Sequence, residues 1–197
     1  PVEGTGGAQV ILEGVEVYAS DMSPDAQTVM VSTQEPEAAG GWNIRTLDMT
    51  SGELAPAISG PSTEFGATYS PDGRWIAYTE FASNVGQIIV RPLDGGARRW
   101  QVNQQSGFYP FWGPDGTTLY YVDAAGDVMA VEVMESGSTF RSGAPRFFTK
   151  AAPPQPGGNP NTLHPDGSRI LFVSGDVSAD ETGYLRLVTD WKRGLVN

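Results

Sequence analysis

Four short runs of consecutive apolar residues recur along the chain, each directly after a turn-like segment. The clearest is Trp75-Ile76-Ala77-Tyr78. A strand covered on both faces has this pattern, whereas a strand with one wet face alternates between apolar and polar residues. We therefore expect Trp75, Tyr78, Tyr120 and Phe172 to be buried between sheets. The predicted strands are Thr28–Thr33, Trp75–Glu80, Thr118–Val122 and Ile170–Val173.

Each of these runs is followed, across a polar loop, by another β-rich run. Glycine turns such as Asp94-Gly95-Gly96 then lead to a fourth strand, and no segment longer than a turn has the helical period. The repeating unit is thus four antiparallel strands. The third strands are predicted at Trp42–Asp48, Gln87–Leu93, Asp127–Val133 and Tyr184–Asp190.

The segment before each doubly apolar run carries a Pro-Asp turn motif. Proline presets φ, aspartate accepts backbone N–H groups, and glycine takes the position with φ above zero. Ala26 stands where the other three turns have glycine, which puts the geometry of that turn in question. The predicted turn residues are Pro24, Asp25, Pro71, Asp72, Gly73, Pro114, Asp115, Gly116, Pro165, Asp166 and Gly167.

Four-stranded units repeated about every 45 residues predict an all-β fold, the β-propeller. The chain 1–197 is interpreted as one domain with four blades, at about 15–59, 60–105, 106–150 and 151–197. Residues 1–14 either end a preceding blade of a longer, partial propeller or close a four-bladed ring through a strand at Gln9–Glu13. We favour the partial propeller, and ring closure stays open. Ala151–Pro160, rich in Pro and Gly, is predicted to be an extended connection.

The composition narrows the choice of partner. A net charge of −11 and a pI near 4.4 argue against binding to nucleic acid and to anionic membrane surfaces, and favour a cationic partner. No apolar run approaches the ~18 residues of a membrane span, so no direct membrane insertion is expected of this segment. The chain has no cysteine, so disulfides and thiolate metal sites are excluded.

Little in the sequence indicates catalysis. The single histidine, His164, occupies the turn position of Ser23 and Ser70, which predicts a structural role. One histidine without cysteine does not fit the familiar zinc sets, and the turn aspartates are explained by capping of the turns. No Gly-x-Ser-x-Gly elbow, P-loop or dinucleotide fingerprint is present. We therefore predict a protein that is not an enzyme and has no metal or cofactor.

The loops between second and third strands contain many carboxylates and no Lys or Arg, whereas Arg74, Arg98, Arg99 and Arg169 belong to the opposite rim. This distribution predicts a docking surface for a cationic protein or peptide. Phe108 and Tyr109, in a loop that enters a blade on the same face, can add a binding platform, while Phe111 and Trp112 are predicted to be core. The candidate binding residues are Glu37, Trp42, Glu80, Phe81, Phe108, Tyr109, Asp123 and Asp180.

The stretches Ser70–Tyr78, Ile89–Leu93 and Trp100–Val102 resemble the WD40-like, or PD40, repeats of TolB-type propellers. With Phe147-Phe148 and Val188–Trp191, they are most similar to the propellers that follow the kinase domain of bacterial eukaryotic-like serine/threonine kinases. No kinase motif is present, so the resemblance implies no kinase activity.

What the resemblance implies is a non-catalytic module that binds a protein, peptide or other ligand. It would be the sensor or scaffold part of a larger signalling or TolB-like protein, on the periplasmic or extracellular side of a bacterial membrane. An alternative is the substrate-gating propeller of a prolyl-oligopeptidase-type serine peptidase, whose propellers resemble this one. The oligomeric state is left open.

Overall fold

The computed structural model describes residues 11–12, 16–34, 41–137 and 139–150, and the backbone of 161–163 and 170–172. All regular elements in these ranges are β-strands. None of the described residues forms a helix long and apolar enough to cross a membrane. The predicted all-β class is therefore confirmed.

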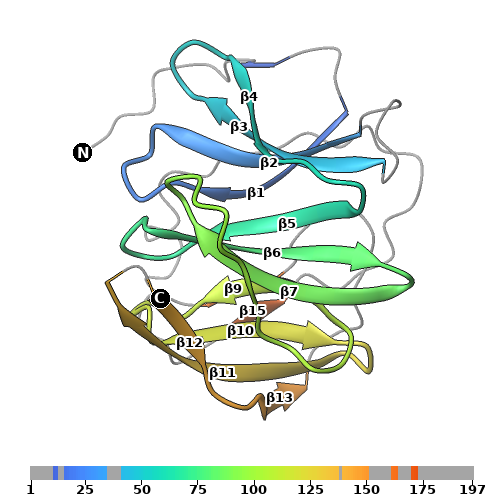
Figure 1. Cartoon of the computed structure of the whole chain (residues 1–197). Coiled ribbons are helices and arrows are strands. Elements are labelled where there is room, and N and C mark those ends of the chain that lie inside the picture. The colour runs from blue at the N-terminus through green and yellow to red at the C-terminus, as the bar shows by residue number, and fades with distance from the viewer. Residues whose placement is uncertain are drawn as a thin grey trace, which may run out of the picture.

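The first two sheets each contain four antiparallel strands in chain order. The first consists of β1 (Val17–Met22), β2 (Thr28–Gln34), β3 (Trp42–Asp48) and β4 (Leu54–Ile58). The second consists of β5 (Thr63–Tyr69), β6 (Trp75–Ala82), β7 (Val85–Pro92) and β8 (Trp100–Gln101). Figure 1 shows the sheets stacked face to face, as propeller blades are.

The third sheet has a divided outer edge. It begins with β9 (Gly107–Trp112), β10 (Thr118–Asp123) and β11 (Asp127–Ser136). The long β11 then pairs with β12 (Thr139–Ser142) along one half and with β13 (Arg146–Lys150) along the other. A two-stranded sheet, β14 (Asn161–Leu163) and β15 (Ile170–Phe172), follows. We refer to the three larger sheets as blades 1, 2 and 3.

The predicted strands agree with the structure to within a few residues, and Trp42–Asp48 matches β3 residue for residue. Trp75, Tyr78 and Tyr120 are buried as expected. Of the strand predicted at 9–13, only Ile11 and Leu12 are described, and neither is in a strand. The strand predicted at 184–190, the connection at 151–160 and the side chain of Phe172 lie outside the described residues.

The hydrophobic core lies between the blades. Met30 and Ile44 of blade 1 pack against Ile76, Tyr78 and Ile89 of blade 2. Because β6 is apolar at consecutive positions, its alternate residues face the other way and build a second layer against blade 3. That layer contains the buried residues Trp75, Ala77, Ile88, Val90, Val102, Trp112, Leu119, Tyr121, Val131, Val133 and Phe140.

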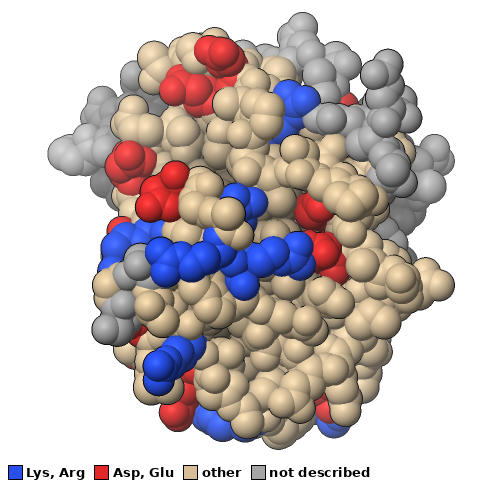
Figure 2. All heavy atoms as spheres, viewed as in Figure 1, with Lys and Arg blue, Asp and Glu red and all other residues tan. Residues whose placement is uncertain are grey.

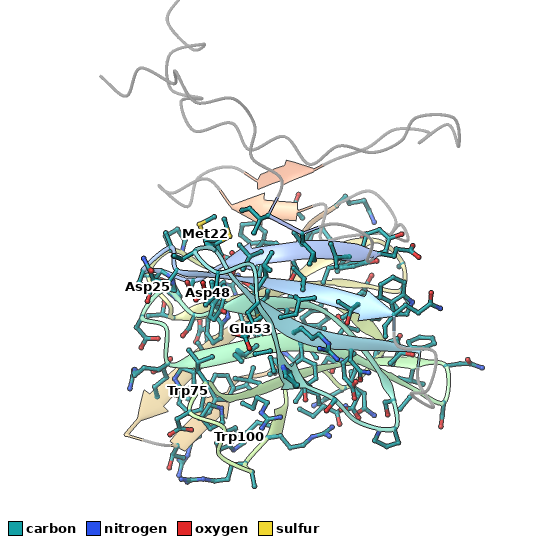
Figure 3. The ribbon with its side chains drawn as sticks, turned by 90° about the horizontal axis from the view of Figure 1, so that it is seen from above. Met22, Asp25, Asp48, Glu53, Trp75 and Trp100 are labelled. Carbon is teal, nitrogen blue, oxygen red and sulfur yellow. The ribbon has the colours of Figure 1, made fainter. Side chains whose placement is uncertain are left out.

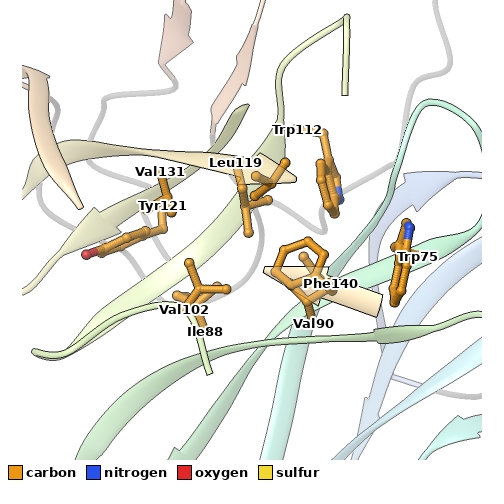
Figure 4. Close-up of a cluster of buried hydrophobic side chains, with 11 residues drawn as sticks. Trp75, Ile88, Val90, Val102, Trp112, Leu119, Tyr121, Val131 and Phe140 are labelled. Atoms are coloured by element: carbon orange, nitrogen blue, oxygen red, sulfur yellow. The ribbon is translucent and has the colours of Figure 1, made fainter. Parts of the chain in front are cut away.

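The hairpin of β11 and β12 closes this second layer at the outer edge. Phe140 on β12 is 1% exposed, and its ring centre lies 5.5 Å from that of Trp75, 5.9 Å from that of Trp100 and 6.4 Å from that of Trp112. Figure 4 shows Phe140 next to both buried tryptophans, Trp75 and Trp112. Aromatic pairs at these distances add to the burial of apolar area, so one residue of blade 3 binds the outer strand of blade 2.

The Pro-Asp turns have the predicted geometry wherever they are described. The amides of Ala26, Gly73 and Gly116 donate to the carbonyls three residues earlier, at 2.8, 2.8 and 3.0 Å. The Ser23 hydroxyl and then the Gln27 amide donate to Asp25, and the Thr117 amide donates to Asp115. These hydrogen bonds lower the pKa of both carboxyls. Ala26 adopts φ of 58°, close to the 70° of Gly73, so the alanine takes the left-handed conformation of the glycine that it replaces.

A hydrogen bond of one kind joins each blade to the next. The amide of Gly66 in β5 donates to Ser32 Oγ in β2 (3.4 Å), and the amide of Tyr109 in β9 donates to Thr79 Oγ1 in β6 (3.0 Å). Both donors have positive φ, 63° and 52°, and both lie where the strand register shifts by a bulge. The bulge turns the amide out of its own sheet and toward the preceding blade.

We predict that Ala26→Gly stabilises the protein by about 0.5–1 kcal/mol, because a left-handed alanine carries a steric cost that glycine lacks. Gly73→Ala is the matched control and should lose about 1 kcal/mol by the same reasoning. A Cβ at Gly73 meets only ordinary contacts, the nearest at 3.6 Å, so φ alone decides the outcome. Urea unfolding measures both changes, and a stability unchanged in both variants would contradict the explanation.

Thr79→Val should cost about 1–3 kcal/mol of unfolding free energy, because it leaves the buried amide of Tyr109 without its acceptor. Thr33→Val is the control, since Thr33 Oγ1 is buried and has no hydrogen-bond partner among the described residues. Its removal should be neutral or stabilising. Equal losses of stability in the two variants would show that the bond between blades contributes nothing specific.

Candidate binding surface

The loops between second and third strands gather at one end of the stack, which we call the 2–3 loop end. The antiparallel register places Gln34 opposite Trp42, Thr63 opposite Phe81, and Gly107 opposite Asp123. In Figure 1, β2, β6 and β10 all point to the right, toward this end. The Pro-Asp turns lie at the opposite end, which we call the turn end.

Two aromatic pairs lie at the 2–3 loop end. The rings of Tyr18 and Trp42 in blade 1 are 5.1 Å apart between centres, and Phe81 of blade 2 lies 6.2 Å from Phe108 of blade 3. All four side chains are partly exposed. Phe108 fits there because Gly86 has no side chain: a Cβ at Gly86 would lie 2.7 Å from Phe108 Cε1. The predicted binding residues Trp42, Phe81 and Phe108 are thus accessible on three successive blades.

Tyr109, also predicted to bind, is only 5% exposed. Its ring packs against Phe65 of blade 2 at 5.4 Å between centres, and burial raises the pKa of its hydroxyl. The bulge that directs its amide to Thr79 also turns its ring into the space between the blades. Tyr109 is therefore part of the core. Phe111 and Trp112 are core as well, as predicted.

Glu80 lies in a small charge cluster between blades 1 and 2. Its carboxylate forms an ion pair with Arg99, Nη2 to Oε2 at 2.9 Å. Glu64, directly opposite Glu80 in the β5–β6 register, is only 2% exposed. Its Oε2 has no hydrogen-bond partner among the described residues, while the backbone N–H of Gly60 bonds the carboxyl group. The cluster therefore holds two carboxyl groups and one guanidinium.

The Glu64 carboxyl has an unusual pKa. Burial, and then the negative charge of Glu80, raise it to about 7, while the Gly60 amide and Arg99 oppose the rise only in part. Glu64 is the clearest titrating group near neutral pH in this surface. It was not among the predicted residues.

The prediction that Arg99 belongs to the rim opposite Glu80 is wrong for its charged group. The arginine begins in the β7–β8 connection, but its long side chain carries the guanidinium to Glu80. Asp127 is also paired, with Lys150 Nζ at 2.7 Å. Asp123 accepts the amides of Ala125 and Asp127, both at 2.9 Å, so it shapes its turn. The described part of the acidic surface is partly neutralised.

Carboxylates also occupy the turn end. Figure 3 labels Asp25 and Asp48 there, and Asp48 accepts the backbone amides of Thr50 and Ser51. Arg74 forms ion pairs with Asp72 and Glu135. In Figure 2, Lys and Arg side chains form a band across the middle of the molecule, with carboxylates on either side. The simple division into an acidic and a basic rim is therefore incorrect for the described residues.

Several predicted residues lie outside the described ranges. They are Glu37, Asp180, the turn residues Pro165, Asp166 and Gly167, and also His164 and Arg169. Within the ranges given above, no group of three or more acidic or histidine side chains is placed to hold a metal ion.

Two partners in this surface were missed from the sequence, Tyr18 and Glu64. Tyr18 could have been identified from the sequence, because it stands near the start of the first strand of its blade, where it contacts the predicted Trp42. Glu64 could not have been identified in this way. Counting back from the Pro-Asp turn without a bulge would place Phe65 opposite Glu80, and the bulge between Phe65 and Thr68 shifts the register by one residue.

Comparison with known proteins shows the fold. No protein-family model matches the chain. TolB from Acinetobacter baumannii is similar in structure with a TM-score of 0.61 at 17% identity, over 85% of this chain and 40% of that one. A putative TolB from Agrobacterium tumefaciens gives 0.58 at 20%, over 87% of this chain and 64% of that one. An auxiliary nutrient binding protein from Bacteroides thetaiotaomicron gives 0.54 at 14%, over 73% and 35%.

These similarities confirm a TolB-like β-propeller fold. The chain spans less than two thirds of the length of each of these three proteins, so it matches only part of each of them. The relation to the propellers of bacterial kinases stays a prediction.

We predict that the stability of the protein falls as pH rises from about 4.5 to about 7, because the unfolded chain releases the Glu64 proton in this range while the native protein retains it. Glu80, Arg99 and the Gly60 amide are the groups around Glu64 that set this behaviour. Glu64→Gln cannot titrate, so it should match the parent near pH 4 and be more stable at pH 8.

Urea unfolding across this pH range measures the difference. Glu132→Gln removes an exposed carboxylate on β11 and controls for the change in net charge. Parallel pH profiles for the parent and Glu64→Gln would contradict the prediction.

Proposed function

We propose that this chain is a non-catalytic binding module that docks a protein or peptide partner on its 2–3 loop end. The observation that carries the proposal is the set of accessible aromatic side chains on three successive blades, Trp42, Phe81 and Phe108. Glu80 precedes Phe81 in β6 and adds a carboxylate at the same end of the strand. Large aromatic side chains supply much of the binding energy of protein interfaces, and a rigid sheet holds them at fixed spacing.

The partner we propose is cationic. The chain has a net charge of −11, and Glu80, Asp123 and the predicted Glu37 and Asp180 belong to loops of this end. Because Arg99 already pairs with Glu80, a basic side chain of the partner would have to displace that guanidinium. Removing Arg99 should then strengthen binding, although the sequence placed Arg99 on the rim opposite the binding surface.

The names of similar proteins support a binding role. Two are TolB proteins and one is a nutrient binding protein. From the resemblance to TolB-type propellers we further propose a place on the periplasmic or extracellular side of a bacterial membrane, within a larger signalling or TolB-like protein. No described feature favours the alternative of a peptidase-gating propeller.

The test uses basic octapeptides of Lys, Trp and Gly as probes, titrated into the chain by calorimetry at low and raised salt. Phe81→Ala and Phe108→Ala should each weaken binding about tenfold, as for an aromatic anchor. Glu80→Lys should weaken it further, and Arg99→Ala should strengthen it a few-fold. Leu93→Ala is the control, because Leu93 is 41% exposed at the turn end.

Added salt should weaken binding, since part of the attraction is between exposed charges. Affinity that does not respond to salt, or that is lost in Leu93→Ala and kept in Phe108→Ala, would place the partner elsewhere and overturn the proposal.

A further inference from the structure

The outermost strands of blades 2 and 3 are both interrupted, and the interruptions face each other. In blade 2, β8 contains only Trp100 and Gln101, although its neighbour β7 has eight residues. In blade 3, the outer edge breaks between the end of β12 at Ser142 and the start of β13 at Arg146. Between the breaks lies an open groove of about 550 Å³, lined by residues 101–104 and 142–145.

Asn103 explains why β8 ends early. Val102 still donates its amide to Ile88 O at 2.9 Å, as a strand would. The amide of Ile88, however, is bonded by Asn103 Oδ1 at 2.7 Å, and Asn103 Nδ2 donates to Gly86 O at 2.8 Å. The side chain thus takes the place of strand backbone along the edge of β7, and the chain after Gln101 is moved outward.

This arrangement leaves backbone groups of blade 2 directed into the groove. In an antiparallel pair, residues that bond the neighbouring strand alternate with residues whose N–H and C=O point away from it. Since Val102 bonds β7, the N–H and C=O of Gln101 point away, and β8 is the last strand of its sheet. Gln101 Nε2 donates to Asn103 O at 3.0 Å and so covers the next outward carbonyl. An open strand edge of this kind is a template for a further strand.

The lining of the groove selects among ligands. Its lining residues are Gln101–Gln104 and Ser142–Pro145, none of them charged or aromatic, and the side-chain amide of Asn103 is already bonded within blade 2. Without charges it offers nothing specific to an ion, and without an aromatic ring it lacks the flat face on which a sugar stacks. Its volume lies within the range of about 300–1,000 Å³ typical of ligand sites. The ligand that still fits this lining is an uncharged peptide backbone, in which N–H donors alternate with C=O acceptors.

We propose that this groove binds an extended, uncharged peptide segment, which adds a strand to the outer edge of blade 2. The backbone of the segment exchanges hydrogen bonds with Gln101, and its other side faces the break at Gly143–Pro145 of blade 3. In this mode of recognition, the affinity comes from main-chain hydrogen bonds, and the side chains of the bound peptide contribute little to it. The site is on the outer edge of the blades. None of its lining residues belongs to the aromatic surface of the 2–3 loop end, although Asn103 bonds Gly86, which lies against Phe108.

The probes are acetylated and amidated octapeptides of Ser, Thr, Val and Gln, added to the isotope-labelled chain and followed by backbone amide NMR. Saturable shifts should be confined to residues 101–104 and 142–145. The same peptides with every second amide N-methylated should bind at least tenfold more weakly, because they lack the donors that a strand edge requires. Maltotriose serves as the sugar probe and should cause no shift.

Two variants of Gln101 separate the contribution of its backbone N–H to peptide binding from the contribution of its side chain. Gln101→Pro removes the outward N–H, which the fold does not use, and should reduce affinity at least tenfold. Gln101→Ala keeps the N–H and should bind within about threefold of the parent, since β-augmentation depends on the main chain. Circular dichroism and thermal unfolding confirm that each variant is folded, and the N-methylated peptides provide the same test if Gln101→Pro is not.

The absence of shifts at millimolar peptide, equal binding of the N-methylated peptides, or shifts with maltotriose alone would overturn the proposal. Shifts confined to the region of Trp42 and Phe108 would also overturn it, while leaving the function proposed for the 2–3 loop end intact.

Discussion

The structure depends on the need to cover strands that are apolar on both faces. In β6, Trp75 and Ala77 face one way and Ile76 and Tyr78 face the other, and all four are buried. No single sheet can satisfy such a strand, so each blade requires a neighbour on either side. Stacking of blades follows from this requirement, and the loops are then fixed at two ends of the stack. The position of every surface described above is a consequence of it.

Most of the fold was accessible to sequence reasoning because it is encoded locally. Apolar runs, Pro-Asp turns and glycine turns placed the strands of three blades closely, and even Ala26, which departs from the motif, adopts the φ of the glycine it replaces. The pairing of charged side chains was less accessible. It depends on a bulge that shifts the β5–β6 register by one residue and on the reach of the Arg99 side chain across its sheet. Neither the bulge nor the reach of the arginine produces a periodic pattern of residues that sequence analysis could detect.

The candidate surface shows the same division. Trp42, Phe81 and Phe108 were predicted from their positions at strand ends and are accessible there, whereas Tyr109, their neighbour in sequence, is buried. One residue separates an accessible ring from a core ring, because the bulge in β9 rotates Tyr109 inward. The sequence-based prediction of a negative surface counted the carboxylates of the loops. In the structure two of these carboxylates form ion pairs, Glu80 with Arg99 and Asp127 with Lys150, so the surplus of negative charge is smaller.

The hydrogen bond between blades has a consequence for cooperativity. Its acceptors, Ser32 and Thr79, each stand eight residues after the turn proline, and its donors, Gly66 and Tyr109, five residues before the next one. The matching positions at the following junction are Val122, which has no hydroxyl, and Pro160, which has no N–H. The bond can therefore link blades 1, 2 and 3 into one unit that opens together, whereas the sequence does not supply the same donor and acceptor at the following position of the repeat. In a ring of repeated blades, the boundary of a cooperative folding unit can thus be set by two residues.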